Sequence, residues 1–205
     1  MENLILSGKP LEKAEKVLIM VHGRGGSAED ILSLAGSLNV STYALIAPQA
    51  PGNTWYPQSF MAAREANEPS LSRSLQTLSS IVKDLVDKGF TKDQIYFLGF
   101  SQGACLVLEF VAAHAARYGG VAAFTGGVIG AQLDHRKYNG NLDGTPVFIG
   151  SSDPDFHVPV VRVKETTTLL EDMGAKVTEV IYQDMGHTIN DSEISHVNRL
   201  IFKDF

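Results

Sequence analysis

The chain has 205 residues and a formal net charge of −6. This length suffices for one substantial hydrophobic core but is short for two, so we expect a single domain over residues 1–205. The negative charge argues against nucleic acid as a partner, because phosphate binding needs a basic surface. The apolar runs are strand-sized, far shorter than the roughly 20 residues of a membrane-spanning helix, so no stable membrane insertion is expected.

Cysteine content and the N-terminal residues predict the compartment. Cys105 is the single cysteine, which excludes an internal disulfide framework and fits a reducing environment. The first residues carry an early acid, Glu2, and no basic segment of the kind that opens a secretory signal. Together these features predict a cytoplasmic protein.

Strand-like and helix-like segments alternate along the first half of the chain. Residues 16–21 form an apolar run without polar alternation, which indicates a strand buried on both faces. A glycine-rich turn follows, and Ser27 is a candidate helix N-cap with Asp30 three residues later. We then expect a helix at 27–38, a strand at 42–47, an irregular proline-rich segment at 48–69 and a helix at 70–88 that ends at Gly89.

The alternation continues in the second half. We expect strands at 94–98, 121–125, 146–150 and 176–183, and helices at 102–118, 158–173 and 190–205. The strand at 176–183 alternates more than the others, as an edge strand does. This order predicts a mostly parallel α/β sheet with helices on both faces. Ligands bind beyond the carboxyl ends of such strands, so residues that directly follow a strand are the candidates for chemistry.

Residues 99–103 read Gly-Phe-Ser-Gln-Gly and match the G-x-S-x-G nucleophile elbow. The motif places Ser101 on a sharp strand-to-helix turn, where its hydroxyl projects clear of the backbone. The flanking glycines leave room for the neighbouring strand and helix. We interpret Ser101 as a nucleophile, with a plain strand–turn–helix connection as the alternative. The helix that starts here makes the Gln102 backbone N–H the natural donor to a developing oxyanion.

Six histidines compete for the role of general base. The base should follow both the nucleophile and the acid, in a loop beyond a late strand. His187 has this position, between the last predicted strand and the last predicted helix. His114 and His196 lie within predicted helices, and His22 precedes Ser101. We therefore predict His187 as the base, with a solvated loop histidine as the alternative.

The third catalytic group should be a carboxylate that holds the far imidazole nitrogen. Two candidates follow the strand at 146–150. We prefer Asp153, because it is closer to the end of that strand and Pro154 stiffens the loop after it. Asp155 is the alternative, with a turn as its simpler role. His157, in the same loop, is interpreted as structural or pocket-lining.

Residues 22–26, with sequence His-Gly-Arg-Gly-Gly, follow the first strong strand. They resemble the H-G-G-G-type loop that supplies a second oxyanion donor. Glycines let the backbone approach a substrate oxygen, and the expected donor is the backbone N–H of Arg24.

These motifs occur in an order that resembles a known family. The blocks are Met-Val-His-Gly-Arg-Gly-Gly at 20–26, Ala-Pro-Gln-Ala-Pro at 47–51 with Trp-Tyr at 55–56, Gly-Phe-Ser-Gln-Gly-Ala at 99–104, Asp-Pro at 153–154 and Gly-His at 186–187. Over nearly its whole length the chain resembles the phospholipase/carboxylesterase family, which includes the acyl-protein thioesterases.

The resemblance implies an α/β-hydrolase fold without a large cap domain. It implies hydrolysis of carboxylic esters or thioesters through an acyl-enzyme on Ser101, with no metal and no organic cofactor. The family triad carries over to Ser101, Asp153 and His187, and the oxyanion donors to Arg24 and Gln102. The expected partner is a small-molecule ester or thioester. The sequence leaves the oligomeric state open between a monomer and a homodimer, which related proteins commonly form.

One departure from the family pattern concerns substrate size. After the His-Gly pair the family commonly has an apolar residue and then Gly-Asp, whereas this chain has Arg24-Gly25-Gly26. A charged Arg24 side chain beside the acyl pocket would disfavour long-chain, membrane-lipid or lipidated-protein substrates. In the alternative, the side chain points to solvent and only its backbone matters.

Other residues near the predicted site have competing interpretations. Trp55 and Tyr56 are substrate-pocket candidates, because their loop should overhang the site. A hydrophobic cluster beneath that loop is the alternative. Cys105 lies one helical turn after Ser101, where we expect it to face the core as an inert apolar residue.

Two other functions compete with an esterase. A dienelactone-hydrolase-like lactonase shares the fold, but such enzymes typically carry cysteine where this chain has Ser101. A catalytically silent binding protein on the same fold would lack or displace one member of the triad, and all three residue types are present here in order.

Overall fold

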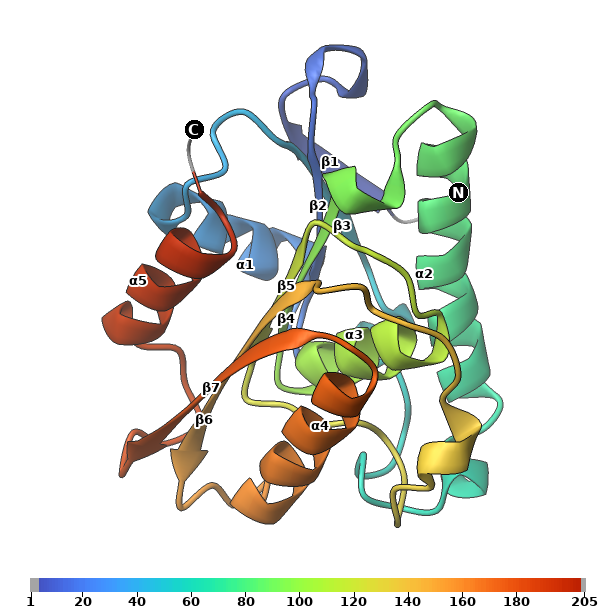
Figure 1. The fold of residues 1–205 in the computed structure, drawn as a ribbon, viewed down its shortest axis with the longest axis vertical. Coiled ribbons are helices and arrows are strands. Elements are labelled where there is room, and N and C mark those ends of the chain that lie inside the picture. Colours follow the sequence, from blue (N-terminus) through green and yellow to red (C-terminus); the bar gives the residue numbers. More distant parts are fainter. Residues whose placement is uncertain (1–3, 204–205) are drawn as a thin grey trace.

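The computed structural model describes residues 4–203, which contain one seven-stranded sheet with strand order β1-β3-β2-β4-β5-β6-β7 (Figure 1). Strand β1 pairs with β3 in antiparallel orientation, and every other pairing is parallel, so the predicted mostly parallel sheet is confirmed. The strands are β1 Leu4–Gly8, β2 Val17–Val21, β3 Ala44–Pro48, β4 Ile95–Phe100, β5 Gly120–Phe124, β6 Pro146–Asp153 and β7 Lys176–Gln183.

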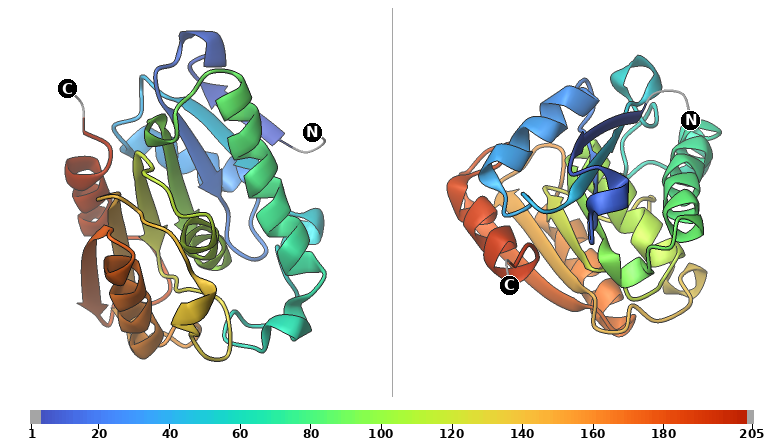
Figure 2. Two further views of the ribbon diagram at one scale, coloured as in Figure 1. Left: turned by 45° about the vertical axis from the view of Figure 1, so that its right-hand side comes forward. Right: turned by 90° about the horizontal axis from the view of Figure 1, so that it is seen from above.

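Helices cover both faces of the sheet, as predicted (Figures 1 and 2). Helices α2, α3 and α4 pack on one face, and α1 and α5 pack on the other. The core consists of two separate clusters of buried side chains, one on each face. The α-helices are α1 Ala28–Ser33, α2 Ser70–Asp87, α3 Gln102–Ala113, α4 Val160–Asp172 and α5 Asp191–Leu200. Within residues 4–203, no helix combines the length and apolar character that crossing a bilayer requires.

The burial of each strand follows from its sequence pattern. Strands β2, β3 and β5 are buried at every position, as continuous apolar runs require when helices cover both faces. Strand β7 is only half-buried along its length, and its predicted edge position is confirmed. Strand β1 forms the opposite edge and was not expected, because its short run carries no strong strand pattern.

Local sequence signals set the ends of several helices. Ser27 and Asp30 form a reciprocal capping box at the start of α1, as their spacing predicts. Helix α2 buries the apolar face expected from its period, which consists of Leu71, Leu75, Leu78, Ile81, Val82 and Leu85. Helix α3 ends at Ala113 and not near Tyr118, where the sequence places its end.

One boundary difference concerns the functional site. Strand β6 continues to Asp153, three residues beyond the predicted end at Gly150. Its last residues pair in register with β7, ending with Asp153 opposite Gln183. The chain therefore leaves the sheet after Asp153, close to the loop that joins β7 to α5.

Candidate active site

Ser101 lies on the turn between β4 and α3, with φ 53° and ψ −117°. A side chain in this region of φ and ψ costs about 1–3 kcal/mol and persists only where the surrounding structure enforces it. Two hydrogen bonds fix the backbone: Ser101 N–H donates to Phe124 O at 2.9 Å, and Ser101 O accepts from Cys105 N–H at 3.0 Å. The strained turn directs the hydroxyl away from the helix, whose first turn it does not cap.

The two motif glycines are required by close backbone approach. A Cβ on Gly99 would lie 2.5 Å from Gly103 O, and a Cβ on Gly103 would overlap the backbone oxygen of Val21. Backbone atoms cannot rotate away as a flexible side chain can. Any larger residue at either position would therefore displace β4 or α3, and with them the hydroxyl of Ser101.

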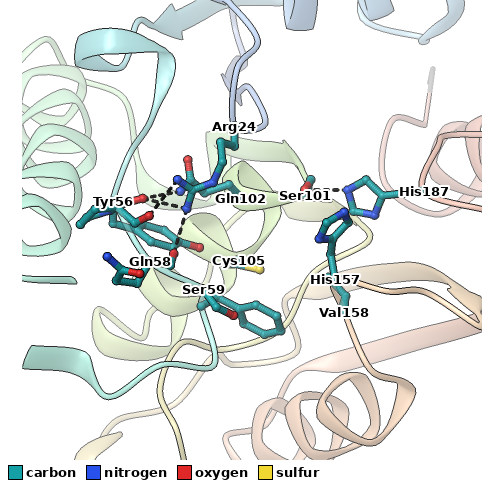
Figure 3. A pocket seen from close by; sticks show the side chains of 12 residues that line it. Arg24, Tyr56, Gln58, Ser59, Ser101, Gln102, Cys105, His157, Val158 and His187 are labelled. Carbon is teal, nitrogen blue, oxygen red and sulfur yellow. Dashed lines mark hydrogen bonds between the residues drawn. The ribbon is translucent and has the colours of Figure 1, made fainter. Parts of the chain in front are cut away.

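His187 lies in the loop between β7 and α5 and contacts the nucleophile (Figure 3). Its Nε2 atom is 2.8 Å from Ser101 Oγ, and its Nδ1 atom is 2.8 Å from Asp155 Oδ2. A carboxylate accepts only, so Nδ1 carries the proton and donates. Nε2 is then left with its lone pair and accepts the hydroxyl proton of Ser101.

The prediction of Asp153 as the partner of this histidine is wrong, and Asp155 holds that place. The rule that the acid directly follows a strand is obeyed, but strand β6 is longer than its sequence pattern indicates. Asp153 is still in the sheet, where its side chain is exposed and its backbone oxygen accepts from Asp184 N–H at 3.0 Å. Asp155 is the first carboxylate beyond the strand end.

The Asp155 side chain is fully buried and accepts three hydrogen bonds. Oδ1 accepts from the backbone N–H groups of His157 and Val158 at 2.7 and 2.9 Å, and Oδ2 accepts from His187. Burial alone would raise the pKa of this carboxyl, but the hydrogen bonds outweigh it and hold the pKa below its ordinary value. The group is therefore a stable anion that accepts the Nδ1 proton of His187.

The glycine-rich loop at residues 22–26 abuts the nucleophile. A Cβ on Gly23 would lie 3.3 Å from Phe100 O and 3.5 Å from Ser101 Cβ, so the next peptide unit, that of Arg24, is beside the elbow. The Gln102 N–H is the first of helix α3 and has no intrahelical acceptor. The proposed oxyanion donors thus belong to two backbone segments that meet at Ser101.

The Arg24 side chain borders the cavity, and the neighbouring loop holds its guanidinium through neutral acceptors. Its guanidinium donates four hydrogen bonds to residues 54–58: to Thr54 Oγ1 at 3.0 Å and to the backbone oxygens of Tyr56, Pro57 and Gln58 at 2.9, 3.1 and 2.8 Å. The interpretation that places this side chain beside the pocket is therefore confirmed, and the alternative, in which only the backbone of Arg24 matters, is wrong. Arg24 fastens the loop that forms one wall of the site (Figure 3).

The Gln102 side chain also holds this loop, a role that the sequence analysis missed. Its Oε1 accepts from Trp55 N–H at 2.9 Å, and its Nε2 donates to Tyr56 O at 2.8 Å. The side chain is buried despite its polarity. A glutamine beside a nucleophile and directly inside a helix was the available signal, because a buried amide must find partners.

The two aromatic pocket candidates have different roles. Tyr56 lines the cavity, but Trp55 does not, and the prediction of substrate contact is wrong for Trp55. Trp55 is buried in the core and donates its indole N–H to His22 O at 2.8 Å. This hydrogen bond links the loop at 54–58 to the glycine-rich loop, so Trp55 supports the walls of the site without lining the cavity.

A cavity of about 400 Å³ opens beside the nucleophile (Figure 3). Its lining combines polar groups of the fastened loop with apolar side chains, and consists of Arg24, Tyr56, Pro57, Gln58, Ser59, Phe60, Ser101, Gln102, Cys105, His157, Val158 and His187. The volume lies within the usual range of small-molecule sites. His157 lines this cavity, and its ring packs edge-on against that of His187 at 5.0 Å.

Two further groups near the site are chemically silent. Burial raises the pKa of the Cys105 thiol to about 12, so the thiol stays protonated although it borders the cavity. His22 is buried, with Nδ1 against Gly23 O at 2.7 Å and Nε2 accepting from Ala50 N–H at 3.1 Å. Burial lowers the pKa of His22, and its neutral ring anchors the glycine-rich loop. Among residues 4–203, no cluster of His, Cys, Asp or Glu is arranged to hold a metal ion.

The mostly parallel sheet, the strained elbow and the linked serine, histidine and aspartate define a serine hydrolase of the α/β-hydrolase fold. The model of the phospholipase/carboxylesterase family matches residues 7–203. The chain belongs to this family. It is accordingly a carboxylic ester hydrolase of the esterase or thioesterase type.

Individual relatives agree with this assignment. A crystal structure of a phospholipase/carboxylesterase from Dyadobacter fermentans is 48% identical, covers 99% of this chain and 97% of its own, and superposes with a TM-score of 0.97. Acyl-protein thioesterase 1 of Kluyveromyces lactis is 29% identical in an alignment that covers 77% of this chain and 77% of that protein. A probable carboxylesterase of Arabidopsis thaliana is 23% identical over 90% of this chain and 77% of its own length.

Proposed function

We propose that this protein hydrolyses small-molecule carboxylic esters or thioesters through an acyl-enzyme on Ser101, with His187 as general base and Asp155 as the acid that orients it. The observation that carries the proposal is the position of the His187 ring, which lies within 2.8 Å of both Ser101 Oγ and Asp155 Oδ2. A nucleophile, a base and a group that orients the base are the three parts that acyl transfer requires.

The first half of the reaction acylates the serine. His187 Nε2 takes the hydroxyl proton while Ser101 Oγ bonds to the carbonyl carbon. The carbonyl oxygen becomes an oxyanion, which the backbone N–H groups of Arg24 and Gln102 stabilise. When this intermediate collapses, the bond to the alcohol or thiol breaks, and the leaving group takes the proton from His187.

The second half releases the acid. A water molecule gives a proton to His187 and attacks the acyl carbon, and collapse of the second intermediate returns the proton to Ser101 Oγ. Asp155 stays ionised throughout, since its hydrogen bonds hold its pKa low. It stabilises the imidazolium that forms in both halves.

The complete triad favours an enzyme over a silent binding protein. Ser101 at the elbow, where dienelactone-hydrolase-like enzymes typically carry cysteine, favours an esterase over a lactonase. The wall formed by residues 54–58 is held by Arg24 and Gln102, so we propose a preformed site of fixed size that takes small acyl groups. The single buried thiol supports a cytoplasmic location, and the oligomeric state stays open between a monomer and a homodimer.

A substrate panel tests this function. Short and long nitrophenyl esters, a long-chain thioester and a lysophospholipid are compared in the protein and in Ser101→Ala. We expect turnover of short esters that the variant lacks. Equal rates in both proteins, or turnover of the long-chain substrates alone, would contradict the proposal.

A further inference from the structure

Asp155 and His187 must meet although they lie on different loops. Asp155 follows β6 and His187 follows β7, and the ladder between these strands ends at Asp153 and Gln183. Beyond that point the loop at residues 184–188 is joined to the β6 side by Asp184 N–H, which donates to Asp153 O at 3.0 Å, and by contacts of Gly186 and His187. Its residues are largely exposed, and a side chain on Gly186 would meet no atom within 4 Å.

The hydroxyl of Ser152 joins the two loops. Gly186 N–H donates to Ser152 Oγ at 2.9 Å, and Ser152 O–H donates to Pro154 O at 3.2 Å. Gly186 directly precedes His187 in the chain, and Pro154 directly precedes Asp155. Ser152 itself is fully buried in strand β6. One side chain on a rigid strand therefore holds the peptide units next to both catalytic groups.

We infer that Ser152 is a positioning residue, whose hydroxyl sets the distance between the Asp155 loop and the His187 loop. This inference rests on the proposed function, because it assigns Ser152 a part in the same reaction. Ser152 contacts neither substrate nor reacting atoms, and it acts through the Asp155–His187 hydrogen bond. A displacement of about 1 Å in such a constellation lowers the rate on the order of 100-fold.

The neighbouring residue offers a matched control. Ser151 lies in the same strand, is also fully buried, and its Oγ has no hydrogen-bond partner among the described residues. Ser151→Ala and Ser152→Ala thus remove the same atom from adjacent buried positions. Only Ser152→Ala breaks hydrogen bonds that reach the catalytic loops.

The experiment measures kcat and KM on a short nitrophenyl ester, together with the thermal midpoint, for the wild type and both variants. We expect kcat of Ser152→Ala to fall about 10- to 100-fold, from misplacement of the base. Its KM should stay within about twofold, because the misplaced base slows acylation and deacylation to a similar degree. Ser151→Ala should match the wild type. A kcat for Ser152→Ala within about twofold of that for Ser151→Ala would overturn the inference.

A second measurement does not depend on the variants. In the wild type, hydrogen exchange of the Gly186 amide should be slow relative to that of the neighbouring Thr188 amide, which donates to Gly186 O within its own loop. Equally fast exchange at both amides would overturn the inference, even if Ser152→Ala does not fold. Absence of ester turnover in the wild type would instead refute the proposed function.

Discussion

Asp155 Oδ2 lies 2.8 Å from His187 Nδ1, and the two residues stand 32 positions apart in the chain. Neither loop holds the pair alone. Two backbone N–H groups donate to one carboxylate oxygen, and the imidazole donates to the other. The base is therefore fixed in the tautomer that accepts a proton from Ser101.

This relationship predicts unequal effects of two similar substitutions. Asp155→Asn should lower kcat on the order of 10⁴-fold, because an amide can donate to Nδ1 and so stabilise the wrong imidazole tautomer. Asp153→Asn should stay close to the wild type, since its carboxylate is exposed and does not contact the imidazole. Steady-state kinetics on a short ester decides between them. A larger loss for Asp153→Asn would restore it as the acid.

The motif glycines predict a steric effect on stability. Gly103→Ala would drive a Cβ into the backbone oxygen of Val21 and should lower the free energy of unfolding by about 3 kcal/mol or more. Gly36→Ala is the control, because that position is exposed and a Cβ there meets no atom within 4 Å. It should change the stability by less than about 0.5 kcal/mol. Urea unfolding measures both, and equal losses would refute the close contact.

The hydrogen bonds from Arg24 to residues 54–58 predict linked changes in stability and substrate binding. Arg24→Ala removes four hydrogen bonds to residues 54–58 and should cost about 1–2 kcal/mol while raising KM, because the wall of the cavity loosens. Arg136→Ala removes a surface arginine whose one ion-pair partner within residues 4–203 is Asp134, and it should leave both quantities unchanged. An unchanged KM in Arg24→Ala would show that the loop keeps its shape without these hydrogen bonds.

Glu193 predicts a pH dependence of stability. Its side chain is buried, its Oε1 has no hydrogen-bond partner among the described residues, and burial raises its pKa from 4.5 to about 7. Below pH 4.5 the carboxyl is protonated in both the folded and the unfolded state. As the pH rises toward 7, the unfolded chain loses the proton first, so the protein loses stability with rising pH.

Glu193→Gln removes this ionisation while keeping the shape of the side chain. Relative to the wild type, the variant should gain about 3 kcal/mol of stability between pH 4 and pH 8. Urea unfolding at a series of pH values measures the difference. A difference that is constant across this range would mean that Glu193 keeps an ordinary pKa.

The sequence predicts what depends on local pattern. The elbow at Ser101, the order of the catalytic residues and the glycine-rich loop are each encoded within a few neighbouring positions. The choice between Asp153 and Asp155 is different, because it depends on where β6 stops pairing with β7. That end is set by contacts between strands that are distant in the chain, and no single segment records it.

Side-chain partners across loops are hidden from the sequence for the same reason. Arg24 and Gln102 are read correctly as neighbours of the site, yet their shared attachment to residues 54–58 follows only from the folded path of that loop. Strand β1 is a further example, since a short run gains its strand conformation from antiparallel pairing with β3.

The identity of the nucleophile is tested most directly by covalent labelling with a fluorophosphonate, followed by mass-spectrometric mapping of the modified peptide. The serine oxygen displaces fluoride from phosphorus, so the label stays on the residue that attacks. We predict one phosphonate per chain, located on Ser101, and none in Ser101→Ala. A label on another residue, or undiminished labelling of the folded Ser101→Ala protein, would contradict the account.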